Sequence, residues 1–318
     1  MIEFEGVTKQ YEQSLALDGL TLTIPDNGLF VLVGPSGSGK TTTVKMINRL
    51  IEPTSGTIKI DGQPINQMDL QTLRLNIGYV LQNIALFPHL TIEENITIQL
   101  EVLKWTKADR QKRARELLEM VHLDPDQYAS RYPSELSGGQ QQRIGIIRAL
   151  ATSPKVILMD EPFSALDPVT RTQLQDLVLS LQKQLHNTIV FVTHDMKEAL
   201  RLGDEIAVMR QGSIQQVGTA KAIFNQPKNE FVREFFDIER QQATLTVQDL
   251  LAADLGTVVN NQPPTITSSA TLAELAQQLV DHPDGGVVAT DGQEQRQLTM
   301  TDLTTLIAKR GYDDDATD

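Results

Sequence analysis

The feature that most constrains this chain is the run GPSGSGKT at residues 34–41, which lies between a predicted strand and a predicted helix. The apolar residues 30–33 precede it, and a helix-compatible segment at 41–50 follows it. Glycines permit backbone dihedrals in which successive N–H groups point at one anion, and the helix N-terminus adds positive potential. This order of strand, glycine-rich loop and helix predicts a phosphate-binding loop, and therefore nucleotide binding.

Each residue type in this run has a chemical use. Lys40 can reach the β- and γ-phosphates of ATP, and the Thr41 hydroxyl can ligate Mg²⁺. A glycine-rich turn followed by a chance Lys-Thr pair is the simpler alternative, but the complete eight-residue pattern in this context disfavours it. We therefore expect the nucleotide to be bound by Gly34, Pro35, Ser36, Gly37, Ser38, Gly39, Lys40, Thr41 and Thr42.

An acidic pair ends a second apolar strand. Residues 156–159 are apolar, and Asp160 and Glu161 follow them directly. In that place Asp160 can hold Mg²⁺ or its water shell, and Glu161 can polarise a water for in-line attack on the γ-phosphate. Alone, such a pair could equally be a solvated turn. With a phosphate loop upstream, the pair indicates nucleotide hydrolysis.

Composition limits the classes of protein to which the chain can belong. A length of 318 residues suggests two domains, and 40% hydrophobic residues suffice for a sizeable core. Cysteine is absent, which excludes disulfide frameworks and thiolate metal sites and fits a reducing compartment. No signal peptide is predicted, and no apolar run approaches the roughly 20 residues that span a bilayer. We expect a soluble cytoplasmic chain that reaches a membrane only through a partner.

The net charge of −13 is unevenly distributed along the chain. After residue 240 there are 12 acidic and three basic side chains, a net charge of −9. A generally basic surface for nucleic acid is therefore not expected. The asymmetry indicates a domain boundary near residue 240.

The pattern of apolar residues predicts strands alternating with helices in the first two thirds of the chain. The stretch 83–105 is apolar without a clear period, so no helix or strand is assigned to it. The alternation elsewhere predicts an α/β fold, with a mostly parallel sheet covered by helices. Strands are expected within 2–24 and 55–63 and at 77–81, 156–159, 189–193 and 205–209, and helices at 41–50, 108–121, 169–185 and 196–202.

A third segment, LSGGQQQR at 136–143, decides the family. With it, residues 1–236 resemble the ATP-binding subunits of ATP-binding-cassette (ABC) transporters. The resemblance implies a P-loop ATPase domain with an antiparallel β subdomain and a helical subdomain, acting as a homodimer with two ATP molecules at its interface. The matching pieces occur in the family's order: Tyr11, GPSGSGKT, Gln82, LSGGQQQR, VILMDEP at 156–162, SALD at 164–167 and VTHD at 192–195.

The resemblance assigns catalytic and metal-binding roles residue by residue. Gln82 would touch Mg²⁺ or the attacking water, and His194 would hydrogen-bond the γ-phosphate. The simpler alternative for Gln82 is a surface amide at the end of a strand. The simpler alternative for His194 is a helix-capping or core histidine. The expected catalytic residues are therefore Glu161, His194 and Gln82, and the expected Mg²⁺ ligands are Thr41, Gln82 and Asp160.

The resemblance also assigns the remaining nucleotide contacts. Tyr11 would stack on adenine, although an ordinary half-buried strand tyrosine is the simpler explanation. The LSGGQQQR segment would bind the ATP held by the opposite subunit, through a hydroxyl, glycine N–H groups and a helix N-terminus. Without the family it would be a helix cap before a polar helix. The residues concerned are Ser137, Gly138, Gly139 and Gln140, with Asp167 at the dimer seam.

Longer runs resemble the osmoprotectant importers within this family. These runs are MINRLIEPTSG at 46–56, YVLQNIALFPHLTIEENI at 79–96, LKWTKADRQKRARELL at 103–118 and ILMDEPFSALDP at 157–168. The resemblance implies import of glycine betaine, carnitine or choline through a separate transmembrane permease and an extracytoplasmic substrate-binding protein. The chain would then sit peripherally on the cytoplasmic face of the membrane, with 83–105 against the permease or, alternatively, packed in its own core.

Residues 247–310 resemble a regulatory module of the cystathionine-β-synthase (CBS) type. Helices are expected at 247–252 and 272–280, strands at 265–267 and 287–289, and a further strand and helix within 298–308. Thr299 to Asp302 matches a ribose-binding Thr/Ser-x-x-Asp motif, but Gln297 stands where a glycine is usual. The module would be small α+β, joined by a linker at 237–246 and followed by an acidic tail at 311–318. A cyclic dinucleotide ligand and simple dimerisation are both open.

Three other functions remain as alternatives. Amino-acid and polyamine importers use similar ATPase subunits, and substrate choice lies in the other chains. Soluble ATPases of the same superfamily act in DNA repair or translation, but repair members insert long coiled coils between the phosphate loop and the LSGGQQQR segment, and translation members usually carry two cassettes per chain. A regulatory subunit without turnover is disfavoured by Glu161 and His194.

Overall fold

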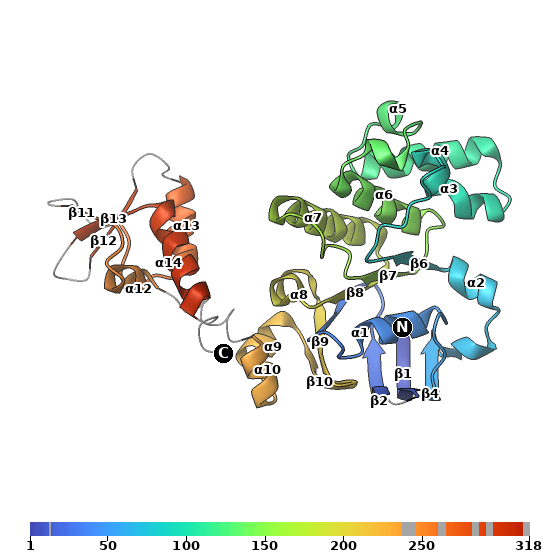
Figure 1. The fold of residues 1–318 in the computed structure, drawn as a ribbon, viewed down its shortest axis with the longest axis horizontal. Helices are drawn as coiled ribbons and strands as arrows, with labels where there is room; N and C mark the ends of the chain where they lie inside the picture. Colours follow the sequence, from blue (N-terminus) through green and yellow to red (C-terminus); the bar gives the residue numbers. More distant parts are fainter. Residues whose placement is uncertain (13, 237–245, 260–264, 282–285, 291–294, 314–318) are drawn as a thin grey trace. The chain divides into compact units, whose positions relative to one another are not determined.

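The computed structural model describes residues 1–12, 14–236, 246–259, 265–281, 286–290 and 295–313. The chain divides into two compact units, Met1–Arg233 and Glu234–Asp318 (Figure 1). The linker expected at 237–246 lies outside the described residues except for its last position. Residues 314–318 of the expected acidic tail also lie outside them.

A six-stranded sheet in the order β10-β9-β3-β8-β7-β6 forms the centre of the first unit. Five of its strands are parallel, and β10 pairs antiparallel with β9. The strands β3, β7 and β8 are buried along their whole length, which explains their continuous apolar sequences. The predicted mostly parallel sheet is therefore confirmed, with strands β3 (Leu29–Val33), β6 (Ile77–Val80), β7 (Val156–Asp160), β8 (Thr188–Thr193), β9 (Glu205–Arg210) and β10 (Ser213–Gly218).

A second, antiparallel sheet in the order β2-β1-β4-β5 lies beside α1 in Figure 1. Its strands alternate buried and exposed residues, so one face packs and the other meets solvent. Side chains from both sheets and from α1 form one core, which includes Phe4, Leu22, Leu32, Val44 and Leu158. The strands are β1 (Ile2–Tyr11), β2 (Ser14–Ile24), β4 (Ser55–Ile60) and β5 (Gln63–Pro64).

Four helices gather into a separate cluster above the six-stranded sheet in Figure 1. One of them, α3, corrects the expectation that 83–105 contains no regular element. Thr91 caps this helix, because its hydroxyl accepts from the N–H of Glu94 while the Glu94 carboxylate accepts from the N–H of Thr91. The cluster comprises α3 (Ile92–Val102), α4 (Lys107–Met120), α5 (Pro125–Tyr128) and α6 (Gly138–Leu150), with a 3₁₀ turn η2 (Pro133–Glu135).

The other helices of the first unit pack around the two sheets. The helix expected at 41–50 ends at Ile47, and the chain then turns at Arg49, whose φ of 54° is left-handed. These elements are α1 (Lys40–Ile47), η1 (Ile65–Gln67), α2 (Leu70–Leu75), α7 (Pro168–Leu185), α8 (Met196–Leu202), α9 (Ala220–Asn225) and α10 (Glu230–Phe235).

In its described residues, the second unit has a small sheet in the order β11-β13-β12 and three helices. Its own apolar core includes Leu250, Leu275, Ala289 and Leu298. The strand expected at 265–267 is wrong: this segment bends, although the N–H groups of Thr265 and Ile266 both donate to the carbonyl of Val288. The elements are α12 (Val247–Ala252), β11 (Thr257–Val259), α13 (Leu272–Asp281), β12 (Val287–Thr290), β13 (Gln295–Leu298) and α14 (Met300–Asp313).

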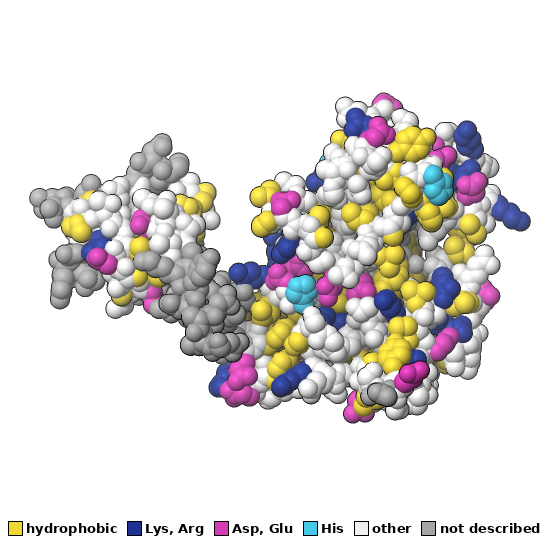
Figure 2. All heavy atoms as spheres, viewed as in Figure 1, with side chains coloured by type: hydrophobic (Ala, Val, Ile, Leu, Met, Phe, Trp, Pro, Cys, Tyr) yellow, Lys and Arg dark blue, Asp and Glu magenta, His cyan; other side chains and the backbone are white. Residues whose placement is uncertain are grey.

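Within the described ranges, no helix is both long and apolar enough to cross a lipid bilayer. On the face that Figure 2 shows, Lys and Arg side chains are interspersed with Asp and Glu.

Candidate functional site

The carboxyl ends of four parallel strands bring the expected site residues to one edge of the central sheet. Gly34 follows β3, Asp160 ends β7, and His194 follows β8. Gln82 comes two residues after β6. Ligands of open α/β sheets bind at this edge. The topology therefore places segments from four distant parts of the sequence around one site.

The phosphate loop curls so tightly that it requires glycine at two positions. A Cβ at Gly34 would lie 2.2 Å from the carbonyl oxygen of Met209, and one at Gly39 would lie 2.7 Å from that of Ala16. Gly39 also has a left-handed φ of 104° at the start of α1. The Ser38 hydroxyl is buried inside this curl and has no hydrogen-bond partner among the described residues. A tight curl of backbone before a helix N-terminus is the arrangement in which loop N–H groups can face an anion.

Lys40 turns its ammonium group back over the loop. Its Nζ donates to the carbonyl oxygens of Gly34 at 2.7 Å and Pro35 at 2.9 Å. Burial lowers the pKa of Lys40, while the negative charges of Glu161 and Asp160 act to raise it. The cation therefore sits between the loop and the acidic pair, where the β- and γ-phosphates of a bound nucleotide are expected.

Thr41, Asp160 and Tyr79 form a hydrogen-bonded group beside the loop. The Thr41 hydroxyl donates to Oδ1 of Asp160 at 2.8 Å, and the Tyr79 hydroxyl lies 3.3 Å from Oδ2. Burial raises the pKa of the Asp160 carboxyl, which is 5% exposed, against the opposing effect of the Thr41 hydrogen bond. A hydroxyl and a carboxylate side by side are the hard oxygen donors that Mg²⁺ takes. Gln82 is exposed, and no hydrogen bond joins it to either residue in this described region.

Glu161 and His194 meet across the ends of β7 and β8. His194 Nδ1 lies 3.1 Å from Oε2 of Glu161, and the Glu161 N–H donates to the carbonyl of Val192 at 3.0 Å. Glu161 has a left-handed φ of 46°, which is an uncommon conformation outside glycine. The backbone of Glu161 is thus held by β8, and its carboxylate is oriented by the imidazole of His194. This is an arrangement that can polarise water.

The LSGGQQQR segment opens α6 on the helical cluster. The Ser137 hydroxyl accepts from the N–H of Gln140, whose side chain accepts in turn from the N–H of Ser137. Asp167 caps α7 through the N–H groups of residues 169 and 170, and hydrogen bonds from the Thr170 hydroxyl and from these N–H groups lower its pKa. A Cβ at Gly139 would lie 2.5 Å from Cγ2 of Thr170, so α6 and α7 begin against each other. The two segments expected at a dimer seam are therefore adjacent.

Comparison with known proteins agrees with this geometry. Residues 17–164 match the ABC transporter family. The chain is 51% identical over 280 residues to the choline transport ATP-binding protein OpuBA of Bacillus subtilis (strain 168), covering 87% of this chain and 72% of that protein. It belongs to the ABC transporter ATP-binding proteins.

Two further matches support the assignment to ABC ATPases. The osmoprotectant import ATP-binding protein OsmV of Salmonella typhimurium (strain LT2) is 49% identical over 298 residues, with 92% of this chain and 76% of that protein covered. A dimeric post-hydrolysis structure of the ATP-binding cassette MJ0796, bound to ADP and Pi, superposes with a TM-score of 0.62 at 36% identity. It covers 69% of this chain and 99% of that one. This ABC protein thus binds and hydrolyses ATP.

Tyr11, which is expected to stack on adenine in this ABC ATPase, has an accessible side chain. The side chain ends β1, is 41% exposed, and has Lys9 Nζ 4.9 Å from its ring centroid. An exposed ring next to a cation can stack on a base.

Sequence reasoning missed two residues in this ABC ATPase, one beside the phosphate loop and one that holds the segment before α3. Tyr79 contacts Asp160 from a neighbouring strand, and nothing in the sequence marks that contact. Asn95 is fully buried on α3, where its side chain accepts from the N–H of Phe87 and donates toward the carbonyls of Phe87, Leu90 and Thr91. A polar residue inside the apolar helix that follows a Thr-x-x-Glu cap was the available signal for Asn95.

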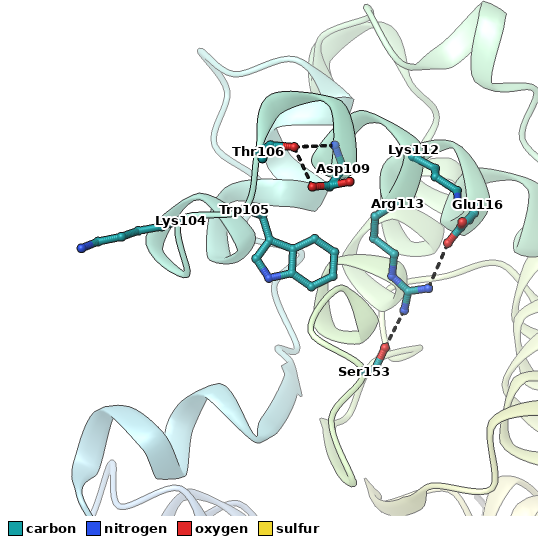
Figure 3. Close-up of a pocket in the computed structure, with 8 residues that line it drawn as sticks. All are labelled: Lys104, Trp105, Thr106, Asp109, Lys112, Arg113, Glu116 and Ser153. Atoms are coloured by element: carbon teal, nitrogen blue, oxygen red, sulfur yellow. Dashed lines mark hydrogen bonds and ion pairs between the residues drawn. The ribbon is translucent and has the colours of Figure 1, made fainter.

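A separate hollow of about 570 Å³ lies on the helical cluster (Figure 3). Trp105 forms one wall of the hollow. The polar side chains that line the hollow mostly bond one another. Thr106 Oγ1 lies 2.6 Å from Asp109 Oδ2, and Arg113 reaches Ser153 Oγ at 2.9 Å and Glu116 at 3.4 Å. None of the nucleotide-site residues of this ABC ATPase lines it.

Proposed function

We propose that this chain is the ATP-hydrolysing subunit that powers import of quaternary ammonium osmoprotectants through a separate permease. Glycine betaine, carnitine and choline are the proposed solutes. The observation that carries catalysis is the meeting of the phosphate loop, Asp160, Glu161 and His194 at one sheet edge. The proposal for the solute rests on the names of relatives about 50% identical to this chain, one for choline and one for osmoprotectants.

In the proposed reaction, Glu161 accepts a proton from water as the water oxygen attacks the γ-phosphorus in line and the bond from that phosphorus to the β,γ-bridging oxygen breaks, which gives ADP and phosphate. His194 holds the carboxylate in place and hydrogen-bonds the γ-phosphate, and Lys40 neutralises charge on the β- and γ-phosphates. Mg²⁺ held by Thr41, Asp160 and Gln82 would supply further charge neutralisation. Phosphoryl transfer depends chiefly on positioning and electrostatics, so these residues account for the chemistry.

Two copies would complete each site. Ser137, Gly138 and Gly139 would present a hydroxyl and N–H groups at the start of α6 to the nucleotide of the opposite subunit. Their position next to Thr170 and the Asp167 cap supports a common seam. A monomer would hold ATP with half of its ligands and would hydrolyse it poorly.

An apolar groove of about 530 Å³ is the proposed docking site for a cytoplasmic segment of the permease. Leu81, Phe87 and Ile98 line it, together with Arg74 and Arg148. Phe87 is 41% exposed, which gives an apolar partner a surface to cover. The chain would be held at the cytoplasmic membrane face by this contact, and an extracytoplasmic binding protein would deliver the solute to the permease.

The second unit is proposed to be a CBS-like regulatory or dimerisation module. A hollow of about 330 Å³ lined by Thr265, Ile266, Thr267, Ser268 and Thr290 offers hydroxyl groups to a nucleotide such as a cyclic dinucleotide. The ribose role suggested for Asp302 has a competitor within the fold. Its Oδ2 already accepts from the N–H and hydroxyl of Thr299, and its Oδ1 from the N–H of Gly256.

Reconstitution in proteoliposomes, with the permease and the binding protein encoded by neighbouring genes, tests the function. We expect ATP-dependent uptake of radiolabelled glycine betaine, carnitine or choline, and no uptake of amino acids or polyamines. Uptake of an amino acid or polyamine instead would contradict the proposed solute class and leave the ATPase assignment standing.

A further inference from the structure

His194 lies between Thr193, whose hydroxyl donates to a buried carboxylate, and Asp195, whose backbone N–H donates to that hydroxyl. Glu198, on the first turn of α8, is 6% exposed. Its Oε2 accepts from the Thr193 hydroxyl at 2.6 Å, and the same hydroxyl accepts from the N–H of Asp195 at 2.9 Å. Hydrogen bonds thus connect the Asp195 N–H to the Thr193 hydroxyl, and that hydroxyl to the Glu198 carboxylate.

Arg171 of α7 joins this group from the other side. Its NH1 lies 3.5 Å from Oδ2 of Asp195, and its Nε lies 3.9 Å from Oε1 of Glu198. Burial raises the pKa of Glu198, and the Thr193 hydrogen bond and the charge of Arg171 oppose that effect. Without Arg171, a buried carboxylate would keep only neutral donors, among them Thr193 and Gln175. The Arg171 guanidinium therefore places one positive charge beside both Glu198 and Asp195.

Arg171 is itself anchored to the turn that carries Asp167. Its NH2 donates to the carbonyl of Leu166 at 3.2 Å. One guanidinium thus links the turn at 164–167 with the loop at 193–195 that carries His194. A planar group with several donors suits a position that must meet a carbonyl and two carboxylates at once.

We infer that Arg171 and Glu198 are positioning residues that hold the 193–195 loop so that His194 faces Glu161. The inference rests on the catalytic roles proposed above for Glu161 and His194. Among the described residues, no hydrogen bond or ion pair joins Arg171 or Glu198 to Glu161 or to the phosphate loop, so their effect on hydrolysis acts through His194. A misplacement of about 1 Å in such a group is enough to lower a rate about a hundredfold.

The test measures kcat and KM for ATP with the full chain assembled in its transporter. Arg171→Gln should lower kcat by about ten- to a hundredfold with KM within about twofold of wild type. Arg171→Lys, which keeps the charge and loses the fork, should fall between the two. Asp176→Asn is the matched control, because it removes the exposed ion pair of Asp176 with Arg201 on the same two helices and should leave kcat unchanged.

A double-mutant cycle with His194→Ala separates positioning from general damage. In the His194→Ala background, Arg171→Gln should cause no further loss, because the residue through which it acts is gone. The double variant Arg171→Gln/Glu198→Gln removes both charges and so leaves no unpaired carboxylate at position 198. If Arg171→Gln alone does not fold, this double variant takes its place in the test, and its kcat should fall by the same ten- to a hundredfold.

The outcomes distinguish the two levels of the account. Equal losses from Arg171→Gln in the wild-type and His194→Ala backgrounds would overturn the positioning role alone. Wild-type turnover by His194→Ala itself would instead contradict the proposed catalytic assignment.

Discussion

The Thr41 hydroxyl donates a 2.8 Å hydrogen bond to Oδ1 of Asp160, although 119 residues separate the two in the sequence. Thr41 lies in the first turn of α1 after β3, and Asp160 is the last residue of β7. Only β8 separates these strands in the sheet, so their carboxyl ends meet at one edge. Two of the three oxygen ligands proposed for Mg²⁺ are thus adjacent in the fold itself.

Replacing Asp160 should separate stability from activity. Asp160→Asn keeps an acceptor for Thr41 but removes a buried charge, so nucleotide-free protein should gain roughly 1 kcal/mol in the free energy of unfolding. The same variant should lose Mg²⁺-dependent ATP hydrolysis. Urea denaturation and a Mg²⁺ titration of turnover measure the two effects. Wild-type turnover at millimolar Mg²⁺ would rule out Asp160 as a metal ligand.

The gain from Asp160→Asn should depend on pH. Burial raises the folded-state pKa of Asp160 above its unfolded value of about 3.9. A carboxyl shifted in this direction contributes its stabilisation below the unfolded-state pKa and loses it as pH rises through the folded-state pKa. The variant's advantage in unfolding free energy should therefore grow as the pH rises from about 4 through the folded-state pKa of Asp160. An advantage that is constant over this range would show that the carboxyl is not shifted.

Gly138 and Gly139 offer a matched pair for testing the dimer seam. A Cβ at Gly138 would have nothing within 4 Å, whereas one at Gly139 would strike Thr170. Gly138→Asp should leave the monomer folded and able to bind ATP, but it should abolish ATP-induced dimers because it brings a negative charge to the partner's phosphates. Gly138→Ala is the control, because it replaces the glycine without adding a charge. Analytical ultracentrifugation with ATP measures both, and dimers of Gly138→Asp would argue against the seam.

Asn95 should matter for coupling to the permease more than for ATP binding. Asn95→Ala removes the side chain that holds the backbone of Phe87 and Leu90 beside the proposed groove, and should destabilise the chain by about 1–3 kcal/mol. Co-purification with the permease should fall while ATP binding persists. Thr97→Ala is the control, since this buried hydroxyl bonds only a carbonyl of its own helix, that of Glu93. Full recovery of permease with Asn95→Ala would contradict the docking site.

The sequence predicted the central sheet well because its strands are continuous apolar runs with clear ends. It failed at α3, where Ile92, Ile96 and Leu100 are buried at helical spacing but Asn95 and Thr97 are buried among them. It also failed at 265–267, where Thr265 bonds β12 through its backbone and hydroxyl without extending as a strand. In both places, tertiary contacts decide the structure.

The site was predictable in its parts and not in its connections. Motif residues such as Lys40 and Asp160 carry their chemistry in their type and spacing. The contact of Tyr79 with Asp160, or of Arg171 with Leu166 and Asp195, depends on how helices and strands pack, and local sequence does not encode it. The residues proposed to position Glu161 and His194 were therefore found only in the structure.

Turnover by Glu161→Gln in the assembled transporter tests the central claim most directly. The substitution keeps the size of the side chain and a hydrogen-bond partner for His194, but removes the proposed base. ATP affinity should stay within about twofold while hydrolysis falls about a hundredfold or more, and an ATP-bound dimer should accumulate. Glu119→Gln, at an exposed position of α4, makes the same change in charge and should keep the wild-type rate. Hydrolysis by Glu161→Gln at a near wild-type rate would contradict the account.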